Sequence, residues 1–180
     1  MDAEELRQEQ EMTGHAKFCP LCGSPVVLRT IDHHERAVCE RCGHITYRNP
    51  VPAAGIILIE DGNILMVRRK FEPRAGLWTL PAGFLEYDEH VEACAVREAG
   101  EETGLTVELT RLFGAYMAMD DPRVQVVLLL YLARRTGGTL VPGDDASEAA
   151  FFPLDATPED IAFKAHEQAL ADVRRMFAVR

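Results

Sequence analysis

The segment from residue 83 to residue 105 constrains the fold and the chemistry more than any other part of the chain, because it places many carboxylates at helical spacing. At about 100° per residue, Glu98, Glu101 and Glu102 lie at about 0°, 300° and 40° around a helix, so they share one face. Like charges this close together repel one another. A solvated acidic face is the ordinary explanation for such a run. The alternative is a site for Mg²⁺ or Mn²⁺, which prefer oxygen ligands.

The helix that carries these glutamates is predicted to span residues 88–103. Asp88 is a suitable N-cap residue, and Gly104 suits the left-handed backbone that ends many helices. Glu86 and Glu89 lie in the loop and at the helix start, where the chain can fold back toward the same space. The segment therefore predicts one helix with carboxylates gathered around it.

Strand signals surround this helix and predict an α/β fold. The dipeptide Asp61-Gly62 between two β-rich runs is a strong hairpin signal, and a turn at residues 120–122 joins two more. Hairpins outnumber β-α-β units, which favours a sandwich with a mixed sheet over a doubly wound parallel sheet. A C-terminal helix is expected from Thr157 onward. The expected strands are residues 26–31, 45–47, 53–60, 63–69, 78–80, 107–119, 124–134 and 150–153.

Two Cys-x-x-Cys pairs mark the N-terminal part of the chain. Their members are Cys19, Cys22, Cys39 and Cys42. A tight turn can point both sulfurs of a pair inward, and Gly23 and Gly43 suit the left-handed backbone of such turns. Four thiolates at about 2.3 Å satisfy tetrahedral zinc with no open position, so the sequence predicts a structural Zn²⁺ site. An iron–sulfur cluster and a zinc-free remnant are the alternatives. His33, His34 and His44 are more readily explained as exposed turn residues than as substitute zinc ligands.

These features divide the chain into three parts. Residues 17–48 are expected to form a zinc ribbon, since about thirty residues are too few to hold a core without metal. A change in composition near Asn49 and Pro50 marks the start of the main domain, residues 49–180. Residues 1–16 form an N-terminal extension, of which the first thirteen are compatible with a frayed helix and are assigned no function.

The charge and the apolar content disfavour several classes of function. With 19 Lys and Arg residues against 29 Asp and Glu residues, the formal net charge is −10, which disfavours extended contact with nucleic acid. No apolar run approaches the ~20 residues that span a bilayer, and the N-terminus lacks the pattern of a secretory signal. No membrane association and a cytoplasmic location are therefore expected. In that compartment the five cysteines should not form disulfides.

The acidic segment resembles the Nudix box, Gly-x5-Glu-x7-Arg-Glu-U-x-Glu-Glu-x-Gly-U, in which U is a bulky aliphatic residue. All seven specified residues match, and Ala99 at the first U position is the one departure. The preceding cysteine segment extends the resemblance to Nudix hydrolases with an N-terminal zinc ribbon. This resemblance implies a Nudix-type α/β/α sandwich with a mixed sheet, preceded by a small zinc ribbon. It also implies hydrolysis of a nucleoside diphosphate linked to another moiety.

The same resemblance assigns roles to the residues of the box. Glu98, Glu101 and Glu102 ligate catalytic Mg²⁺ or Mn²⁺, and the backbone carbonyl of Gly83 also reaches a metal. Arg97 orients a catalytic glutamate by ion pairing. Metals in such a site neutralise the phosphates, orient the attacking water and lower its pKa.

Residues outside the box are candidates for the remaining roles. In some Nudix enzymes the general base lies in a loop beyond the box, and Glu148 is the candidate here. An equally good explanation is that Glu148 is simply an exposed acidic residue of a loop. Phe84 directly follows the box glycine and is the candidate for contact with the substrate base. Trp78 is expected in the core, and Cys94 is expected to pack rather than to act as a nucleophile. A basic cluster contains Arg68, Arg69, Lys70 and Arg74. It is explained equally well as a group that steers phosphates into the site and as the solvated end of a hairpin.

Two subgroups of Nudix hydrolases carry such a ribbon, namely NADH pyrophosphatases and enzymes linked with FAD and ADP-ribose. The Ser-Gln-Pro-Trp-Pro-Phe-Pro array of the first subgroup is missing from residues 114–124, whereas residues 153–155 and 161–163 resemble the C-terminal pattern of the second. The expected activity is therefore Mg²⁺-dependent hydrolysis of FAD or ADP-ribose with release of AMP. NADH hydrolysis, RNA cap hydrolysis and a non-catalytic nucleotide-sensing module are the alternatives. Homodimers are common in the family.

Overall fold

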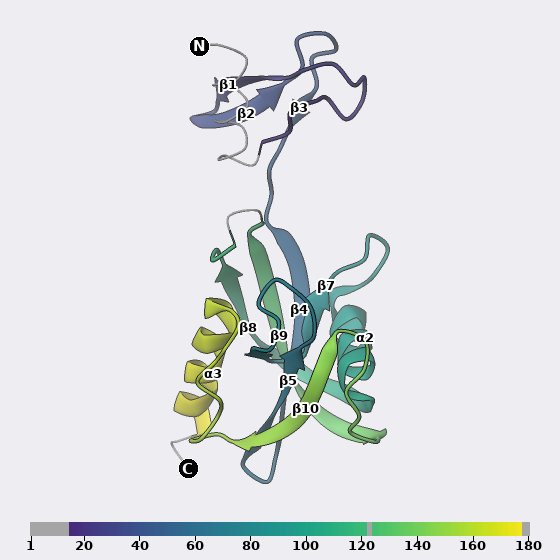
Figure 1. Ribbon diagram of the computed structural model, residues 1–180, viewed down its shortest axis with the longest axis vertical. Coiled ribbons are helices and arrows are strands. Elements are labelled where there is room, and N and C mark those ends of the chain that lie inside the picture. The colour runs from purple at the N-terminus through teal and green to yellow at the C-terminus, as the bar shows by residue number, and fades with distance from the viewer. Residues whose placement is uncertain (1–14, 122–123, 178–180) are drawn as a thin grey trace. The chain divides into compact units, whose positions relative to one another are not determined.

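The computed structural model describes residues 15–121 and 124–177 (Figure 1). The chain divides into two compact units between Pro50 and Val51. The helix considered for the first thirteen residues lies outside the described part, and so does Pro122 of the expected turn. Within the described ranges, no helix is long and apolar enough to cross a membrane.

The N-terminal unit contains a small antiparallel sheet in the order β1–β2–β3. Its strands are β1 (Val27–Ile31), β2 (His34–Val38) and β3 (Ile45–Thr46). The sequence did not predict β2, in which three polar residues precede only two apolar ones, so it lacks the alternation of a strong β signal. Its core consists of Cys19, Val26, Ala37 and Cys39, so two of the four predicted ligands are buried at its centre.

The C-terminal unit is built on one sheet of seven strands, and the sheet is mixed, as predicted (Figure 1). Its main path is β10–β5–β4–β9–β8, with β6 added to β5 and β7 added to β4. The β4–β9 pair is parallel and the other pairs are antiparallel. The strands are β4 (Val51–Glu60), β5 (Asn63–Arg69), β6 (Trp78–Thr79), β7 (Ala82–Phe84), β8 (Leu105–Ala118), β9 (Val126–Gly138) and β10 (Ala146–Pro153).

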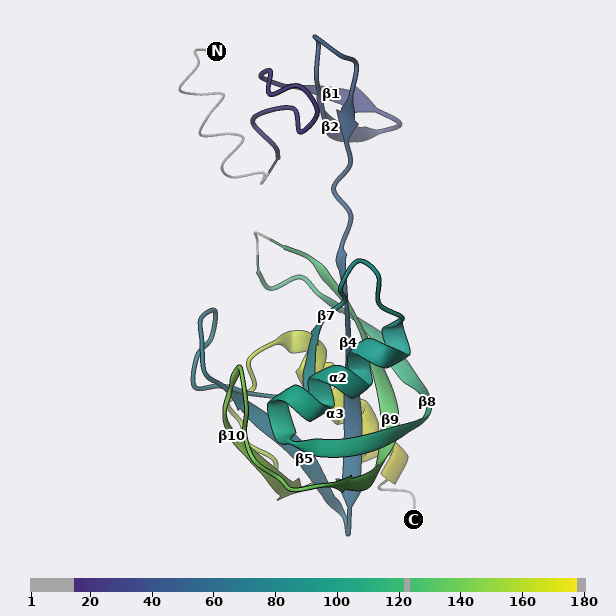
Figure 2. The same cartoon turned by 90° about the vertical axis from the view of Figure 1, so that its right-hand side faces the viewer.

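One helix covers each face of this sheet (Figures 1 and 2). The helices are α2 (Val91–Thr103) and α3 (Lys164–Phe177). Side chains of a strand alternate between its two faces. In β4, Ile56 and Leu58 accordingly join the core beneath α2, whereas Ile57 joins the core beneath α3. The result is the expected α/β/α sandwich.

Both helices begin later than the sequence predicted. Asp88 is not the N-cap of α2, because the helix begins at Val91 and His90 occupies the cap position without a side-chain hydrogen bond. The C-terminal helix begins at Lys164 rather than near Thr157. Residues 160–162 instead add to β6, where Trp78 N–H donates to Asp160 O at 2.9 Å and Trp78 O accepts from Ala162 N–H at 2.9 Å.

The end of α2 is as predicted. Gly104 adopts a left-handed backbone with φ of 69°, and its N–H donates to Gly100 O at 2.8 Å. The chain then turns directly into β8, so the last turn of α2 lies close to the sheet. Thr103 reinforces this turn, because its hydroxyl accepts from Leu105 N–H at 3.2 Å.

Candidate active site

A cavity of about 480 Å³ opens in the C-terminal unit. Glu98 and Glu102 of α2 line it together with β7, which carries Gly83 and Phe84. β7 pairs with β4 so that Gly83 lies beside Ala54, and this pairing brings the loop before α2 against the helix. Two of the three glutamates that the helical spacing had placed on one face therefore line this cavity.

Glu102 is the most deeply buried carboxylate of the cavity, with 8% of the residue exposed. Its Oε2 accepts a hydrogen bond from Ala82 N–H at 3.0 Å. Burial raises the pKa of Glu102 to about 8, because the charged form loses its hydration, and the Ala82 N–H offsets only part of this effect. Without a cation beside it, Glu102 therefore holds a proton near neutral pH.

Glu98 lies directly against the backbone of Gly83. A Cβ atom at residue 83 would lie 2.1 Å from Glu98 Oε1, so no other side chain fits here without displacing the carboxylate. Burial also raises the pKa of Glu98, and the Arg97 guanidinium opposes that rise. The box glycine thus has a steric reason, since it makes room for a carboxylate at the cavity wall.

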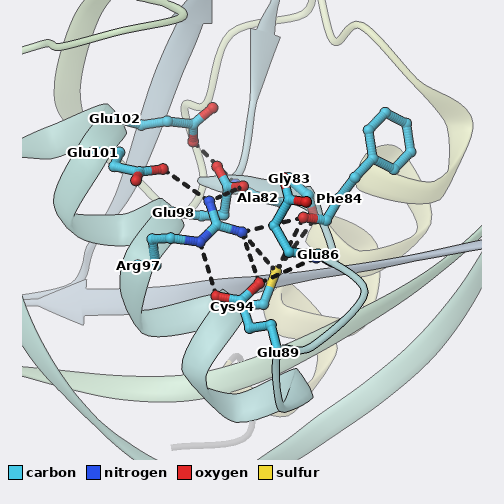
Figure 3. A network of polar contacts seen from close by, with 10 residues as sticks. All are labelled: Ala82, Gly83, Phe84, Glu86, Glu89, Cys94, Arg97, Glu98, Glu101 and Glu102. Carbon is cyan, nitrogen blue, oxygen red and sulfur yellow. Dashed lines mark hydrogen bonds and ion pairs between the residues drawn. The ribbon is translucent and has the colours of Figure 1, made fainter.

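Arg97 connects three carboxylates of the segment (Figure 3). Its Nε and one terminal nitrogen each donate to Glu89 at 2.8 Å, which is a bidentate pair. Its other terminal nitrogen donates to Glu98 Oε1 at 2.7 Å and to Glu101 Oε2 at 2.8 Å. The same guanidinium lowers the pKa of Glu89 to about 2. Arg97 therefore makes with Glu98 the ion pair through which the resemblance to the box implies an orienting role.

A second cavity of about 360 Å³ lies beside the same helix, and carboxylates line it throughout: Glu98, Glu101, Glu102, Asp144 and Asp145. The loop that carries the aspartates is held against the C-terminus of α2. Val141 N–H donates to Thr103 O at 2.9 Å, and Gly143 N–H donates to Glu102 O at 3.3 Å. Gly143 also approaches so closely that a Cβ there would lie 2.5 Å from Glu101 O.

An all-oxygen site of this kind fits hard divalent cations such as Mg²⁺ or Mn²⁺. Its carboxylates are spread around the wall of the cavity and do not converge on a single ion position. Such ions keep several water ligands, so a site for them does not need every carboxylate in direct contact. The residues that would hold them are those of the second cavity, whereas Gly83 lines only the larger one.

The four cysteines of the N-terminal unit fit a different metal. Their sulfur atoms all lie within 4.8 Å of one another, and in the described part of the chain no other group of His, Cys, Asp or Glu residues is this tight. The Cys19–Cys42 and Cys22–Cys39 sulfur pairs are 3.6 Å and 3.5 Å apart. Four thiolates ~2.3 Å from one ion would be separated by ~3.8 Å, so the set fits tetrahedral Zn²⁺.

Comparison with known families agrees with this geometry. Residues 49–173 match the NUDIX domain, and residues 17–48 match the Nudix N-terminal family, a zinc ribbon. The chain belongs to the NUDIX family of hydrolases. The Nudix box and the ribbon that the sequence analysis singled out are thereby confirmed.

Relatives of this Nudix hydrolase differ in their substrates. An ADP-ribose pyrophosphatase of Methanocaldococcus jannaschii is 42% identical over 130 residues, which cover 72% of this chain and 76% of the relative. The NAD-capped RNA hydrolase NudC of Vibrio atlanticus is 30% identical over 175 residues, which cover 93% of this chain but only 62% of that protein. Among solved structures, a NUDIX hydrolase of Nitrosomonas europaea superposes with a TM-score of 0.76 at 32% identity, covering 89% of this chain and 93% of that one.

The structure brings some of the expected substrate contacts into the cavity of this Nudix hydrolase and leaves others outside. Arg69 and Phe84 line the larger cavity. Arg68 and Glu148 line neither cavity, because they form an ion pair with each other at 2.8 Å between β5 and β10. Arg74 does not line a cavity either, but it pairs at 3.0 Å with Asp120, which does.

Trp78 and Cys94 take the packing roles expected of them. Trp78 is buried and meets Phe152 edge to face, with 4.8 Å between ring centroids. The Cys94 thiol is buried near Phe84 O, and burial raises its pKa to about 11, so it is a poor nucleophile.

Sequence reasoning missed Asp144 and Asp145 as site residues. It chose the nearby Glu148, which lies on β10 and whose side chain pairs with Arg68 of β5. The signal that could have identified them was Gly143, since a glycine before two aspartates suits a loop that must pack closely on another backbone.

Proposed function

We propose that this protein hydrolyses the pyrophosphate bond of a nucleoside diphosphate linked to another moiety, with ADP-ribose as the first candidate and FAD as the second, and releases AMP. The observation that carries the proposal is the pair Glu98 and Glu102, which line a cavity of nucleotide size and a second, carboxylate-lined cavity at the same time. A diphosphate at that junction would have its reacting phosphorus beside the glutamates and its nucleoside in the larger cavity.

The carboxylates would hold Mg²⁺ or Mn²⁺, and the bound cations would neutralise the phosphate oxygens and acidify the attacking water. Glu102 would give up its proton when a cation binds, because the cation supplies the charge that burial denies. Arg97 keeps Glu98 in place through one carboxylate oxygen and leaves the other available. Gly83 contributes by admitting the Glu98 carboxylate to the cavity wall.

Asp145 is the stronger candidate for the group that accepts the proton of the attacking water, because it lines both cavities. Glu148, the general-base candidate of the sequence analysis, is the residue with which Asp145 is compared. Asp145→Asn is expected to lower kcat by about 10²- to 10⁴-fold, the range that general bases contribute, whereas Glu148→Gln should leave kcat within about threefold. A large loss in Glu148→Gln with little change in Asp145→Asn would return the role to Glu148.

The preference for ADP-ribose rests on the relative from Methanocaldococcus jannaschii. A different comparison adds a third candidate after ADP-ribose and FAD: the Vibrio NudC relative aligns across the zinc ribbon as well, covering 93% of this chain, and it points to an NAD-type dinucleotide or its RNA-linked form. All of these molecules share the ADP half, and the cavity described above would meet that half in each case.

A panel of ADP-ribose, FAD, NADH and diadenosine polyphosphate tests the proposal, with Mg²⁺ or Mn²⁺ added and products separated by chromatography. Metal-dependent release of AMP from ADP-ribose or FAD is the expected result. Binding of these nucleotides without turnover would identify a sensing module instead. In a separate assay with NAD-capped RNA, preferred cleavage of that RNA, with an affinity that falls steeply as salt rises, would favour RNA cap hydrolysis.

A further inference from the structure

The larger cavity contains a buried acceptor whose partner is missing from the described residues. Asp120 follows β8, lines the cavity, and its side chain is 9% exposed. Its Oδ2 pairs with Arg74 at 3.0 Å and accepts from Lys164 N–H at 3.4 Å. Its Oδ1 is buried with no hydrogen-bond partner among the described residues. A buried acceptor without a donor is costly in free energy, so we expect a bound ligand to supply a hydrogen-bond donor to this oxygen.

A donor of fixed orientation lies in the same cavity. His166 of α3 is 7% exposed and lines the cavity. Its Nδ1 accepts from Leu80 N–H at 3.1 Å, so the proton of the neutral ring must lie on Nε2. Burial lowers the pKa of His166 to about 4, which keeps the ring neutral. His166 can therefore offer one N–H and nothing more to a ligand.

The surroundings of these two groups favour a flat heterocycle over a sugar. Ala118, Val126 and Leu128 give this part of the cavity an apolar wall. Phe163 joins them, and the guanidiniums of Arg69 and Arg74 each lie 5.2 Å from the centroid of its ring. An apolar wall with few polar groups is typical of a pocket for a ring system with one polar edge.

We propose that Asp120 and His166 select a substrate base that presents an amino group beside a ring nitrogen, as adenine does. This inference rests on the proposed function, because it places the nucleoside of the cleaved diphosphate in the larger cavity. The Asp120 carboxylate only accepts hydrogen bonds, so it takes the amino group, and the His166 N–H donates to the ring nitrogen. Hypoxanthine has a carbonyl in place of the amino group and an N1–H in place of the ring-nitrogen acceptor, so it turns an acceptor toward the carboxylate and a donor toward the His166 N–H, which disfavours it.

The test compares kcat/KM for ADP-ribose with kcat/KM for inosine diphosphate ribose. Wild-type enzyme is expected to favour ADP-ribose by about 10- to 100-fold, the size of effect that a hydrogen bond to a charged group confers. In Asp120→Asn the new amide can donate to the hypoxanthine carbonyl, although the His166 N–H still faces N1–H, so the ratio should fall at least about threefold from the wild-type value. The ratio is independent of how much of each preparation is folded.

Two control variants separate base recognition from the change in charge. Asp121→Asn alters the charge of a neighbouring residue that lines the same cavity and should leave the ratio as in wild type. Arg74→Gln removes the partner of Asp120 but keeps the carboxylate, so it should also preserve the ratio. A ratio that collapses in either control would show that charge, not the acceptor, sets the preference, and would overturn the proposal.

Other outcomes are equally decisive. Equal use of the two substrates by wild-type enzyme would overturn base recognition while leaving pyrophosphate hydrolysis intact. A strong loss with the 2′-deoxyadenosine analogue and none with inosine diphosphate ribose would place the ribose against Asp120 and overturn it as well. No hydrolysis of either substrate would instead count against the proposed function itself.

Discussion

Glu102→Gln tests the central carboxylate of the site without changing its shape. In the metal-free chain the protonated form of Glu102 predominates near neutral pH, because burial raises its pKa to about 8. Glutamine has nearly the size of a protonated glutamate, and its carbonyl can still accept from Ala82 N–H. The substitution should therefore preserve the fold while removing a carboxylate that can ionise and ligate a cation.

The magnitude follows from the shift of the Glu102 pKa. The pKa rises from 4.5 to about 8 on folding, and each unit corresponds to about 1.4 kcal/mol. For a carboxyl group whose pKa is raised by folding, the folded state binds the proton more tightly between those two values. Wild-type stability should then fall as pH rises through this window, by up to about 5 kcal/mol in total, relative to a variant that cannot ionise.

The assay is urea unfolding of zinc-loaded protein without added magnesium, from pH 5 to pH 8.5, for wild type and Glu102→Gln. The two proteins should be similarly stable at pH 5, and the variant should be the more stable at pH 8.5. Added Mg²⁺ should stabilise wild type and should stabilise the variant less. Turnover of the preferred substrate by the variant should fall at least ~100-fold, about 2.7 kcal/mol in the barrier.

A control substitution at an exposed glutamate shows the effect of the same chemical change outside the site. Glu108 lies on β8 with an exposed side chain, so Glu108→Gln should leave both the pH dependence and the turnover unchanged. A stability difference between wild type and Glu102→Gln that stays flat from pH 5 to pH 8.5 would refute the burial argument. Near-normal turnover in Glu102→Gln would remove the metal-ligand role.

Three further substitutions probe other parts of the chain. Gly83→Ala should lower kcat at least ~10-fold with little loss of secondary structure by circular dichroism, because its Cβ would displace the Glu98 carboxylate. Cys39→Ser should abolish the zinc content measured by atomic absorption and leave the N-terminal unit open to proteolysis, since the metal site forms its core. Gly100→Ala should stabilise the protein by ~0.5–1 kcal/mol in urea unfolding, because the new methyl group would meet only Leu105 O at 3.8 Å.

The features that sequence could predict are those that short stretches of chain determine. Both cysteine pairs are local turns, and the glutamates of α2 share a face because helix geometry alone puts them there. The hairpin at Asp61 and Gly62 is local in the same sense, since β4 and β5 pair directly across it. The N-terminus of α2 was misplaced because Asp88 has the chemistry of a cap, whereas residues 86–89 form a turn of their own, in which Glu89 N–H donates to Glu86 O.

The rest of the site depends on contacts between distant segments. Asp145 reaches the glutamates because the loop before β10 caps the end of α2, and within the loop only Gly143 hints at that docking. Glu148 seemed equivalent in sequence, but the pairing of β10 with β5 sets it opposite Arg68. A strand alternates its side chains, so a shift of a few residues decides whether a carboxylate faces a cavity or a neighbouring strand.

Arg97 explains how so many carboxylates coexist before any cation binds. Its contacts engage Oε1 of Glu98 and Oε2 of Glu101 and leave the second oxygen of each carboxylate for another partner. Glu102 lowers the remaining repulsion by holding a proton, as its raised pKa allows. Cation binding would then replace that proton rather than the guanidinium, so metal affinity should rise with pH up to about pH 8 while Arg97 keeps its place. Replacement of Arg97 by lysine would lose the bidentate grip on Glu89 and should weaken this coupling, because a single ammonium cannot hold three carboxylates in fixed positions.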